Sequence, residues 1–185
     1  MAETVGKIYS TAFFELCCEE DCLDRGYEEL KEFCSLVCGS DDGDMREFEK
    51  LLCSPLISAE DKGECLRNVF GGSLSALTLD FLCLICDKGR FGSMKEIFED
   101  LRVMYNDRKN ILEVTAVTAA PLTEELREKL TAKLGRTTGR TVVLTEMQDK
   151  SIIGGMIVRY GNTEIDASVK SRLEKLKAQI NGTIA

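Results

Sequence analysis

Histidine is absent from all 185 residues of this chain, and tryptophan is absent as well. Without histidine the chain cannot build a Ser-His-Asp triad, a Cys-His dyad or a His-Glu-x-x-His zinc helix, and it lacks the commonest general base. The carboxylate pairs Glu19-Glu20 and Asp41-Asp42 fall in polar caps and loops, where side chains of this type are ordinarily solvated. The composition therefore predicts a protein that is not an enzyme and that needs no cofactor.

The chain also has little proline, few aromatic residues and no long apolar run. Two prolines and 6% aromatic residues favour helices over a sandwich of short strands. The most apolar segment, residues 77–86, is about half the length of a membrane span and contains Asp80. The first seven residues lack a basic region followed by an apolar run, so no signal peptide is expected. We therefore expect no direct membrane insertion, and any membrane association through a partner.

Charge is distributed unevenly along the chain. Residues 1–110 contain 13 Lys and Arg against 23 Asp and Glu, a net charge of −10, whereas residues 111–185 contain 11 against 9, a net charge of +2. The acidic first part argues against nucleic-acid binding, which needs basic patches. It is compatible with a partner surface that carries basic residues, and equally with a solvated acidic surface that aids solubility.

Nine cysteines are present, all between Cys17 and Cys86. Without a signal peptide, reduced thiols in a cytoplasm are the expected state. Cys83 and Cys86 have zinc-ligand spacing, but they fall within an expected helix, where a free cysteine packs as a small hydrophobe. Other thiols that could complete a site of four are Cys17, Cys18, Cys22, Cys34 and Cys38. Core packing is the favoured interpretation, and a cysteine-based zinc-binding or redox regulatory protein remains the alternative.

Apolar residues in the first 108 positions recur at the three- and four-residue spacing of amphipathic helices. Helix-ending signals at Ser54-Pro55 and Gly71-Gly72, and a capping box that opens at Ser58, divide this region. Six helices are expected, over about residues 5–16, 23–37, 48–52, 58–70, 73–87 and 93–108. The fifth has almost no polar face, so it is either buried on every side or offers one side to a partner.

The pattern changes near residue 110. Residues 111–118 and 141–146 are typical of strands, and residues 123–138 are typical of a helix. Residues 156–160 alternate as a strand, Gly161-Asn162 indicates a hairpin, and Asp166 or Ser168 can cap a last helix. Its apolar stripe is Val169, Leu173, Leu176 and Ile180. The chain is thus expected to be mostly α, with an N-terminal six-helix bundle (1–108) followed by a small α+β domain (109–185).

Gly154-Gly155 precedes the strand at residues 156–160. A phosphate loop would need a Gly-Lys-Ser or Gly-Lys-Thr sequence and a switch from strand to helix, and neither follows. We therefore interpret the pair as a bulge or a close approach of backbone.

The order of features in the closing stretch is distinctive. An Asp, an apolar pair, Gly-Gly, an apolar strand, a Gly turn and Ile-Asp are followed by Ser168-Val169 and a basic, leucine-containing helix. This stretch resembles the delta subunit family of F-type ATP synthases, called the oligomycin-sensitivity-conferring protein in mitochondria. Departures from the family pattern are Ser10, Asp80 and the many cysteines. Further similar segments are residues 7–14, 52–57 with Lys62, 81–82 with 88–90, and 112–116 with 120–123.

The resemblance implies a non-catalytic subunit of the peripheral stalk, at the cytoplasmic face of the cell membrane and peripheral through its complex. The helical domain would bind the amino-terminal helix of an alpha subunit of the catalytic head. The carboxyl-terminal domain would bind the b subunits. Ion-driven rotation would then be coupled to ATP synthesis, because the link keeps the head from turning with the rotor.

Candidate partner-binding residues follow from the pattern of apolar residues and from the family resemblance. The first and fifth helices, which the resemblance assigns to the alpha subunit, supply Tyr9, Ala12, Phe13, Leu79, Leu82 and Cys83. The carboxyl-terminal domain supplies Gly154, Gly155, Val169, Leu173 and Leu176 toward the b subunits.

Overall fold

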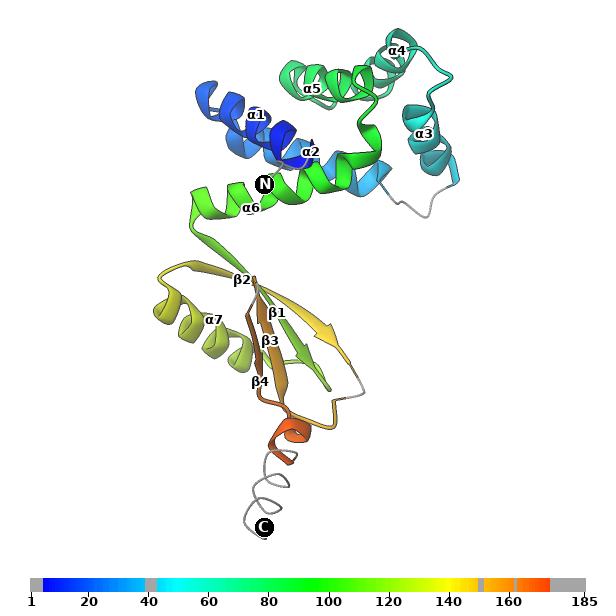
Figure 1. Cartoon of the computed structure of the whole chain (residues 1–185). Helices are drawn as coiled ribbons and strands as arrows, with labels where there is room; N and C mark the ends of the chain where they lie inside the picture. Colours follow the sequence, from blue (N-terminus) through cyan, green and yellow to red (C-terminus); the bar gives the residue numbers. More distant parts are fainter. Residues whose placement is uncertain (1–4, 39–42, 150–151, 162, 174–185) are drawn as a thin grey trace, which may run out of the picture. The chain divides into compact units, whose positions relative to one another are not determined.

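The computed structural model describes residues 5–38, 43–149, 152–161 and 163–173 (Figure 1). The chain divides into two compact units, Met1–Tyr105 and Asn106–Ala185, here called the helical unit and the α+β unit. The sequence pattern suggested a boundary at residues 108–109. The observed division falls slightly earlier, within the last helix of the bundle, which continues without a break to Lys109.

The helical unit contains the six helices that the periodicity predicts, so this part of the fold prediction is confirmed (Figure 1). No helix in the described part of the chain has the length and apolarity that crossing a membrane requires. The elements are α1 (Val5–Glu19), α2 (Leu23–Val37), α3 (Gly43–Cys53), α4 (Ala59–Phe70), α5 (Ala76–Asp87), the short 3₁₀ helix η1 (Phe91–Ser93) and α6 (Met94–Lys109).

Local capping explains where α4 and α5 begin. The Ser58 hydroxyl oxygen accepts the amide of Asp61 at 3.1 Å, as an N-cap residue does, and its hydroxyl donates to the Asp61 carboxylate at 2.7 Å. Ser75 caps α5 in the same way, which places the start of α5 at Ala76 rather than near residue 73. The helix α4 ends at Gly71, as the sequence predicts. Gly71 has a φ of −61° and is in the right-handed conformation, so α4 does not end with the left-handed glycine that is common at helix C-termini.

The core of the helical unit is one apolar cluster to which every helix contributes. The rings of Phe13 and Phe81 lie 4.3 Å apart between centroids and join α1 to α5. The rings of Tyr27 and Tyr105 stack with their centroids 3.9 Å apart and join α2 to α6. The buried members of the cluster are Phe13, Cys17, Tyr27, Leu30, Phe33, Cys34, Val37, Leu52, Leu66, Phe70, Leu74, Leu79, Phe81, Leu82, Ile85, Cys86, Phe91, Met94, Ile97 and Leu101.

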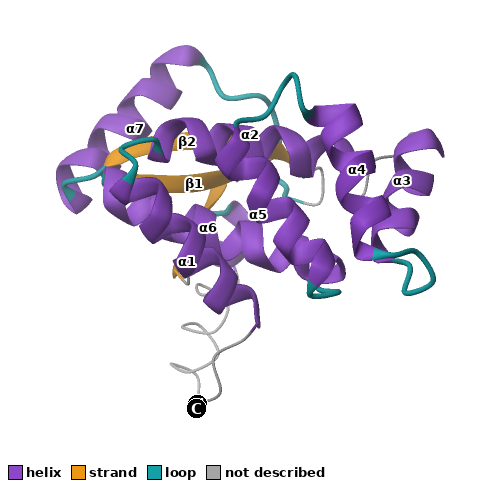
Figure 2. Ribbon diagram, turned by 90° about the horizontal axis from the view of Figure 1, so that it is seen from above, coloured by secondary structure: helices purple, strands orange, loops and turns teal. Residues whose placement is uncertain are grey.

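The α+β unit is a four-stranded mixed sheet with one helix in contact with β2 (Figure 1), and part of the sheet is seen from above in Figure 2. Its strand order is β2-β1-β3-β4, with β1 parallel to β2 and antiparallel to β3. The strand predicted over residues 111–118 is observed with the same bounds. The elements are β1 (Ile111–Thr118), α7 (Glu124–Thr138), β2 (Thr141–Gln148), β3 (Met156–Tyr160) and β4 (Thr163–Asp166).

The two faces of the sheet differ because side chains alternate along each strand. On β2, Val142, Leu144 and Glu146 are half-buried, and Glu146 fixes the start of α7 by accepting the Leu122 amide at 2.7 Å and pairing with Arg127 at 3.2 Å. The alternate residues Val143 and Met147 are exposed. On β2, one face is therefore turned toward α7, and the other carries the apolar side chains of Val143 and Met147 toward solvent.

The sequence predicts a hairpin at Gly161-Asn162, and β3 and β4 are joined at this place. Tyr160 pairs with Thr163 across the hairpin, while Asn162 itself lies outside the described residues. Gly161 has a φ of +51°, the positive value that its place in such a turn requires.

Candidate interaction site

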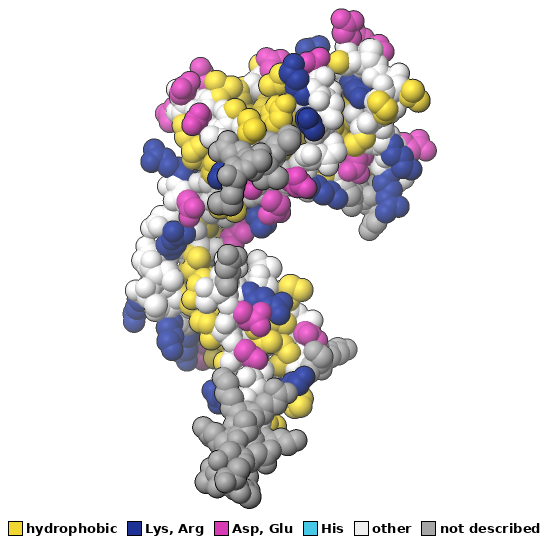
Figure 3. Space-filling view, in the orientation of Figure 1, with side chains coloured by type: hydrophobic (Ala, Val, Ile, Leu, Met, Phe, Trp, Pro, Cys, Tyr) yellow, Lys and Arg dark blue, Asp and Glu magenta, His cyan; other side chains and the backbone are white. Residues whose placement is uncertain are grey.

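An apolar groove lies between α1 and α5 of the helical unit. It has a volume of about 330 Å³, and hydrophobic side chains gather over these two helices (Figure 3). Both walls offer exposed apolar surface, since Leu16 is 43% and Leu84 is 46% exposed. The lining residues are Tyr9, Ala12, Phe13, Leu16, Leu77, Asp80, Phe81 and Leu84.

The predicted residues of α1 lie in this groove. Tyr9 is half-buried, Ala12 is exposed, and Phe13 forms the floor, where its ring meets the ring of Phe81. Their i, i+3, i+4 spacing places the three side chains on one side of α1.

The predicted residues of α5 lie elsewhere. Leu82 is fully buried and Leu79 is nearly so, both in the core of the helical unit. Cys83 is half-buried and faces α4 instead of α1. The groove side of α5 is formed by Leu77, Asp80, Phe81 and Leu84, which the sequence pattern did not single out. The signal that could have identified them is Asp80, the only charged residue between Ala76 and Leu84, because it marks the outward side of the helix.

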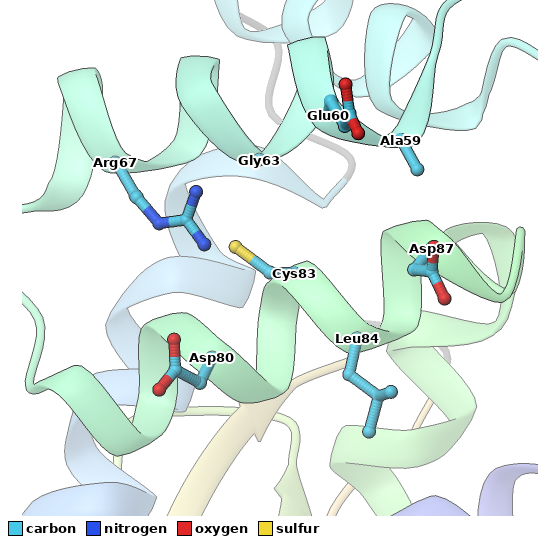
Figure 4. A pocket seen from close by; sticks show the side chains of 8 residues that line it. All are labelled: Ala59, Glu60, Gly63, Arg67, Asp80, Cys83, Leu84 and Asp87. Carbon is cyan, nitrogen blue, oxygen red and sulfur yellow. The ribbon is translucent and has the colours of Figure 1, made fainter.

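A second cleft, with a volume of about 400 Å³, lies on the other side of α5, against α4 (Figure 4). Arg67 and Cys83 point into the space between the two helices in Figure 4. Asp80 and Leu84 line this cleft as well as the α1/α5 groove, so they form the ridge that separates the two. The cleft is lined by Ala59, Glu60, Gly63, Arg67, Asp80, Cys83, Leu84 and Asp87.

A buried carboxylate on α2 holds the beginning of α5 in place. Glu29 is 8% exposed and accepts hydrogen bonds from the Ser75 amide at 3.1 Å, the Ser75 hydroxyl at 2.6 Å and the Thr78 hydroxyl at 2.6 Å. Arg25, one turn earlier on α2, donates to the same carboxylate at 2.7 Å. The position of the α5 wall of the groove thus depends on α2.

The electrostatic balance at Glu29 favours the ionised carboxylate. Burial by itself would raise the pKa of Glu29, but the hydrogen bonds from Ser75, Thr78 and Arg25 outweigh burial and hold the pKa below its ordinary value. A carboxylate at this place also lies at the amino-terminal end of α5, where the helix dipole stabilises negative charge.

In the α+β unit, the backbone at position 155 requires a glycine, whereas the backbone at position 154 does not. The φ of Gly155 is +85°, and a Cβ atom there would lie 2.5 Å from the carbonyl oxygen of Ala167 and 2.9 Å from the Cα of Ser168. At Gly154 an added Cβ would meet only a methyl group of Val169, at 3.4 Å. The pair therefore permits a close approach of backbone, as the sequence indicated, with the constraint concentrated at Gly155.

The start of the last helix is fixed by short-range hydrogen bonds. The Asp166 carboxylate accepts the Ser168 amide at 2.8 Å, and the Ser168 hydroxyl accepts the Ser171 amide at 3.2 Å. Of the predicted stripe, Val169 is 39% and Leu173 is 56% exposed, while Leu176 and Ile180 lie outside the described residues. Ile153, which the sequence pattern did not single out, is 75% exposed.

The cysteines are distributed through the helical unit as free thiols. Burial, with the neighbouring Cys22 adding to it, raises the pKa of Cys17 to about 12, and burial raises the pKa of Cys86 to about 12. Thiolates, the form that binds metals and attacks disulfides, are therefore scarce at both positions near neutral pH. Within the described ranges, no three Cys, Asp or Glu side chains converge as a metal site requires.

Comparison with known proteins gives concordant results along the whole length. A family model described as "ATP synthase delta (OSCP) subunit" matches residues 5–180. The chain is 34% identical over 181 residues to ATP synthase subunit delta of Alkaliphilus oremlandii, covering 98% of each chain. It is 29% identical over 185 residues to the subunit of that name from Clostridioides difficile, covering 100% of each. A chain in the cryo-EM structure of the Toxoplasma gondii mitochondrial ATP synthase hexamer has the same fold, with a TM-score of 0.75, 21% identity, and coverage of 96% of this chain and 98% of that chain.

Proposed function

Because the chain belongs to the ATP synthase delta (OSCP) subunit family, a non-catalytic component of the peripheral stalk of F-type ATP synthases, we propose that it joins the catalytic head to the membrane-anchored b subunits. The helical unit would contact the head and the α+β unit would contact the b subunits. This arrangement places the chain at the cytoplasmic face of the cell membrane, where it is peripheral through its complex.

The observation that carries the proposal is the open groove between α1 and α5. Its walls are apolar apart from Asp80, and Leu16 and Leu84 at its rim are about half exposed although both belong to well-packed helices. An amphipathic helix that places residues i, i+3, i+4 and i+7 in such a groove removes this surface from water. The amino-terminal helix of an alpha subunit is the occupant that we propose.

The α+β unit offers a different kind of surface for the b subunits. Near the start of the last helix, Ile153, Val169 and Leu173 expose apolar side chains around the close approach at Gly155. Since large apolar side chains gathered in one place mark interaction surfaces, this end of the unit is the proposed attachment to the stalk.

The proposed role is mechanical. Rotation driven by ion flow exerts torque on the head, and a fixed link from the head to the membrane opposes that torque. Isolated surface ion pairs contribute little and are screened by salt, so a link under sustained load is better made by extensive apolar interfaces. The helical and α+β units would each supply one such interface, at opposite ends of one covalent chain.

Reconstitution tests the function directly. Membranes stripped of this subunit should retain ATP hydrolysis by the head but lose ATP-driven ion pumping, and addition of the purified chain should restore pumping. A chain with Leu84→Asp, which puts a charge at the rim of the groove, should fold normally and restore less pumping. Pumping that is unaffected by removal of the subunit would contradict the proposal.

A further inference from the structure

We infer that Asp80 selects the partner helix by charge: the helix that enters the α1/α5 groove carries a Lys or Arg on the edge that faces α4. This inference rests on the proposed function, since it specifies the chemistry of the helix that binds there. The groove alone would accept any amphipathic helix of suitable width. Asp80 restricts the choice.

The position of Asp80 supports this role. It is the only charged side chain in the lining of the groove, and it lies on the ridge between the groove and the charged cleft. It is exposed, and no hydrogen bond or ion pair to another described residue is found for its carboxylate. The carboxylate is therefore available to a partner.

The surroundings of Asp80 on the α4 side are acidic overall. The cleft is lined by the carboxylates of Glu60, Asp80 and Asp87 against the guanidinium of Arg67 (Figure 4), and Asp87 also pairs with Lys88 at 3.1 Å, which leaves the group with a net negative charge. The whole region of residues 1–110 has a net charge of −10, which adds a long-range attraction for a basic segment. A helix in the groove would thus meet negative charge along its α4-facing edge.

Desolvation turns this charge into selectivity. A helix that covers Leu77, Phe81 and Leu84 excludes water from one side of the neighbouring Asp80 carboxylate. A carboxylate that loses hydration without gaining a partner is destabilised, whereas a Lys or Arg across the interface replaces the lost hydration and adds a charge-assisted hydrogen bond. An acidic residue at that place on the partner is rejected, so the same side chain favours one partner and excludes another.

The test measures binding of the full chain to a synthetic peptide of the amino-terminal segment of the alpha subunit from the same cell, by calorimetric titration at several salt concentrations. Asp80→Asn should weaken binding about three- to tenfold and reduce its salt dependence. Glu47→Gln is the matched control, because it removes the same charge from the exposed surface of α3, outside the groove and the cleft, and should leave affinity within about twofold. Arg67→Gln should act in the opposite direction and strengthen binding.

Charge reversal gives the decisive comparison. Asp80→Lys should abolish most binding of the natural peptide, and replacement of one particular Lys or Arg of the peptide by Glu should restore it. Unchanged affinity and salt dependence in Asp80→Asn, with binding by the unaltered chain intact, would overturn the inference and leave the proposed function standing. Failure of the unaltered chain to bind the peptide would contradict the head contact itself, and the inference with it.

Discussion

The helical unit and the α+β unit bury apolar surface in different ways. Twenty buried apolar residues form one cluster in the helical unit, whereas the buried apolar residues described in the α+β unit are Val114, Ala116, Val117, Ile152 and Val158. No residue of α7 is fully buried, although it is the helix that covers the sheet. The helical unit has a core of its own and keeps its groove as a surface feature. The α+β unit has a thin core and much exposed apolar surface.

This difference bears on how each unit would bind. A groove between helices that share a well-packed core is preformed, so little ordering is needed when a partner helix enters. In the α+β unit, Ile153, Val143, Met147 and Leu173 are each about half or more exposed, and a partner that covers them would add to the stability of the unit. We expect binding of the head to use the preformed groove of the helical unit. We expect binding of the b subunits to stabilise the α+β unit.

The largest effect is expected from a pair of substitutions on α5. Leu82→Ala should lower the free energy of unfolding of the helical unit by about 2–5 kcal/mol, because Leu82 is fully buried in the cluster. Leu84→Ala, two residues later, should cost less than about 1 kcal/mol and instead weaken binding to the alpha-subunit peptide. Chemical denaturation and titration of the same two proteins check both expectations. Equal losses of stability would show that α5 has no partner-facing side.

In the α+β unit the largest effect should come from Gly155→Val. The positive φ and the contact of an added Cβ with the Ala167 carbonyl oxygen together should cost about 3 kcal/mol, since backbone atoms cannot move aside as a flexible side chain can. The matched control is Gly154→Ala, where the added carbon meets only a Val169 methyl group. Hydrogen exchange should show the loss in the α+β unit alone. A spread of the loss into the helical unit would mean that the two units do not fold independently.

Glu29→Gln should have an intermediate effect, about 2 kcal/mol at neutral pH, because it weakens the charge-assisted hydrogen bonds to Ser75 and Thr78. The folded-state pKa of Glu29 lies below its ordinary value, so its stabilising contribution is present above the ordinary carboxyl range and is lost as the pH falls through the lowered pKa. Denaturation of both proteins across the acid range should therefore show their difference shrinking toward low pH. A difference that does not change with pH would contradict the role of the ionised carboxylate.

The smallest effect is expected at the surface pair of Arg159 and Glu164, on β3 and β4. Arg159 Nε and Glu164 Oε2 lie 2.6 Å apart, but both side chains are more than half exposed. Arg159→Ala should change the free energy of unfolding by less than about 0.5 kcal/mol, because solvent and salt screen such pairs. Thermal unfolding at low and high salt checks this. A large, salt-sensitive loss would mean that the thin core of the α+β unit relies on its surface charges.

Local pattern predicted much of the fold. The bounds of β1, the two-residue turn at Gly161 and the Ser58 cap follow from residues near one another in sequence, whose propensities agree with the final structure. The strand order of the mixed sheet could not be predicted in this way. Pairing of β1 with β3 depends on contacts between residues about 40 apart in the chain, which periodicity does not report.

The candidate sites were predictable only in part. The side of α1 that lines the groove followed from its amphipathic stripe, but α5 has apolar residues all round, so spacing alone could not separate core residues such as Leu82 from groove residues such as Leu84. Glu29 could not be found from sequence, because its partners Ser75 and Thr78 are more than 40 residues away. Gly154 and Gly155 are identical residues next to each other, so the sequence could not show that the positive φ and the close backbone contact belong to Gly155.

A fragment of residues 1–109, which keeps α6 whole, tests most directly whether the two units divide the binding between them. Binding of this fragment and of the full chain would be measured against the isolated catalytic head and against the b subunits. We expect the fragment to bind the head as tightly as the full chain does and not to bind the b subunits. Binding to the b subunits by the fragment, with loss of binding to the head, would contradict this division of binding.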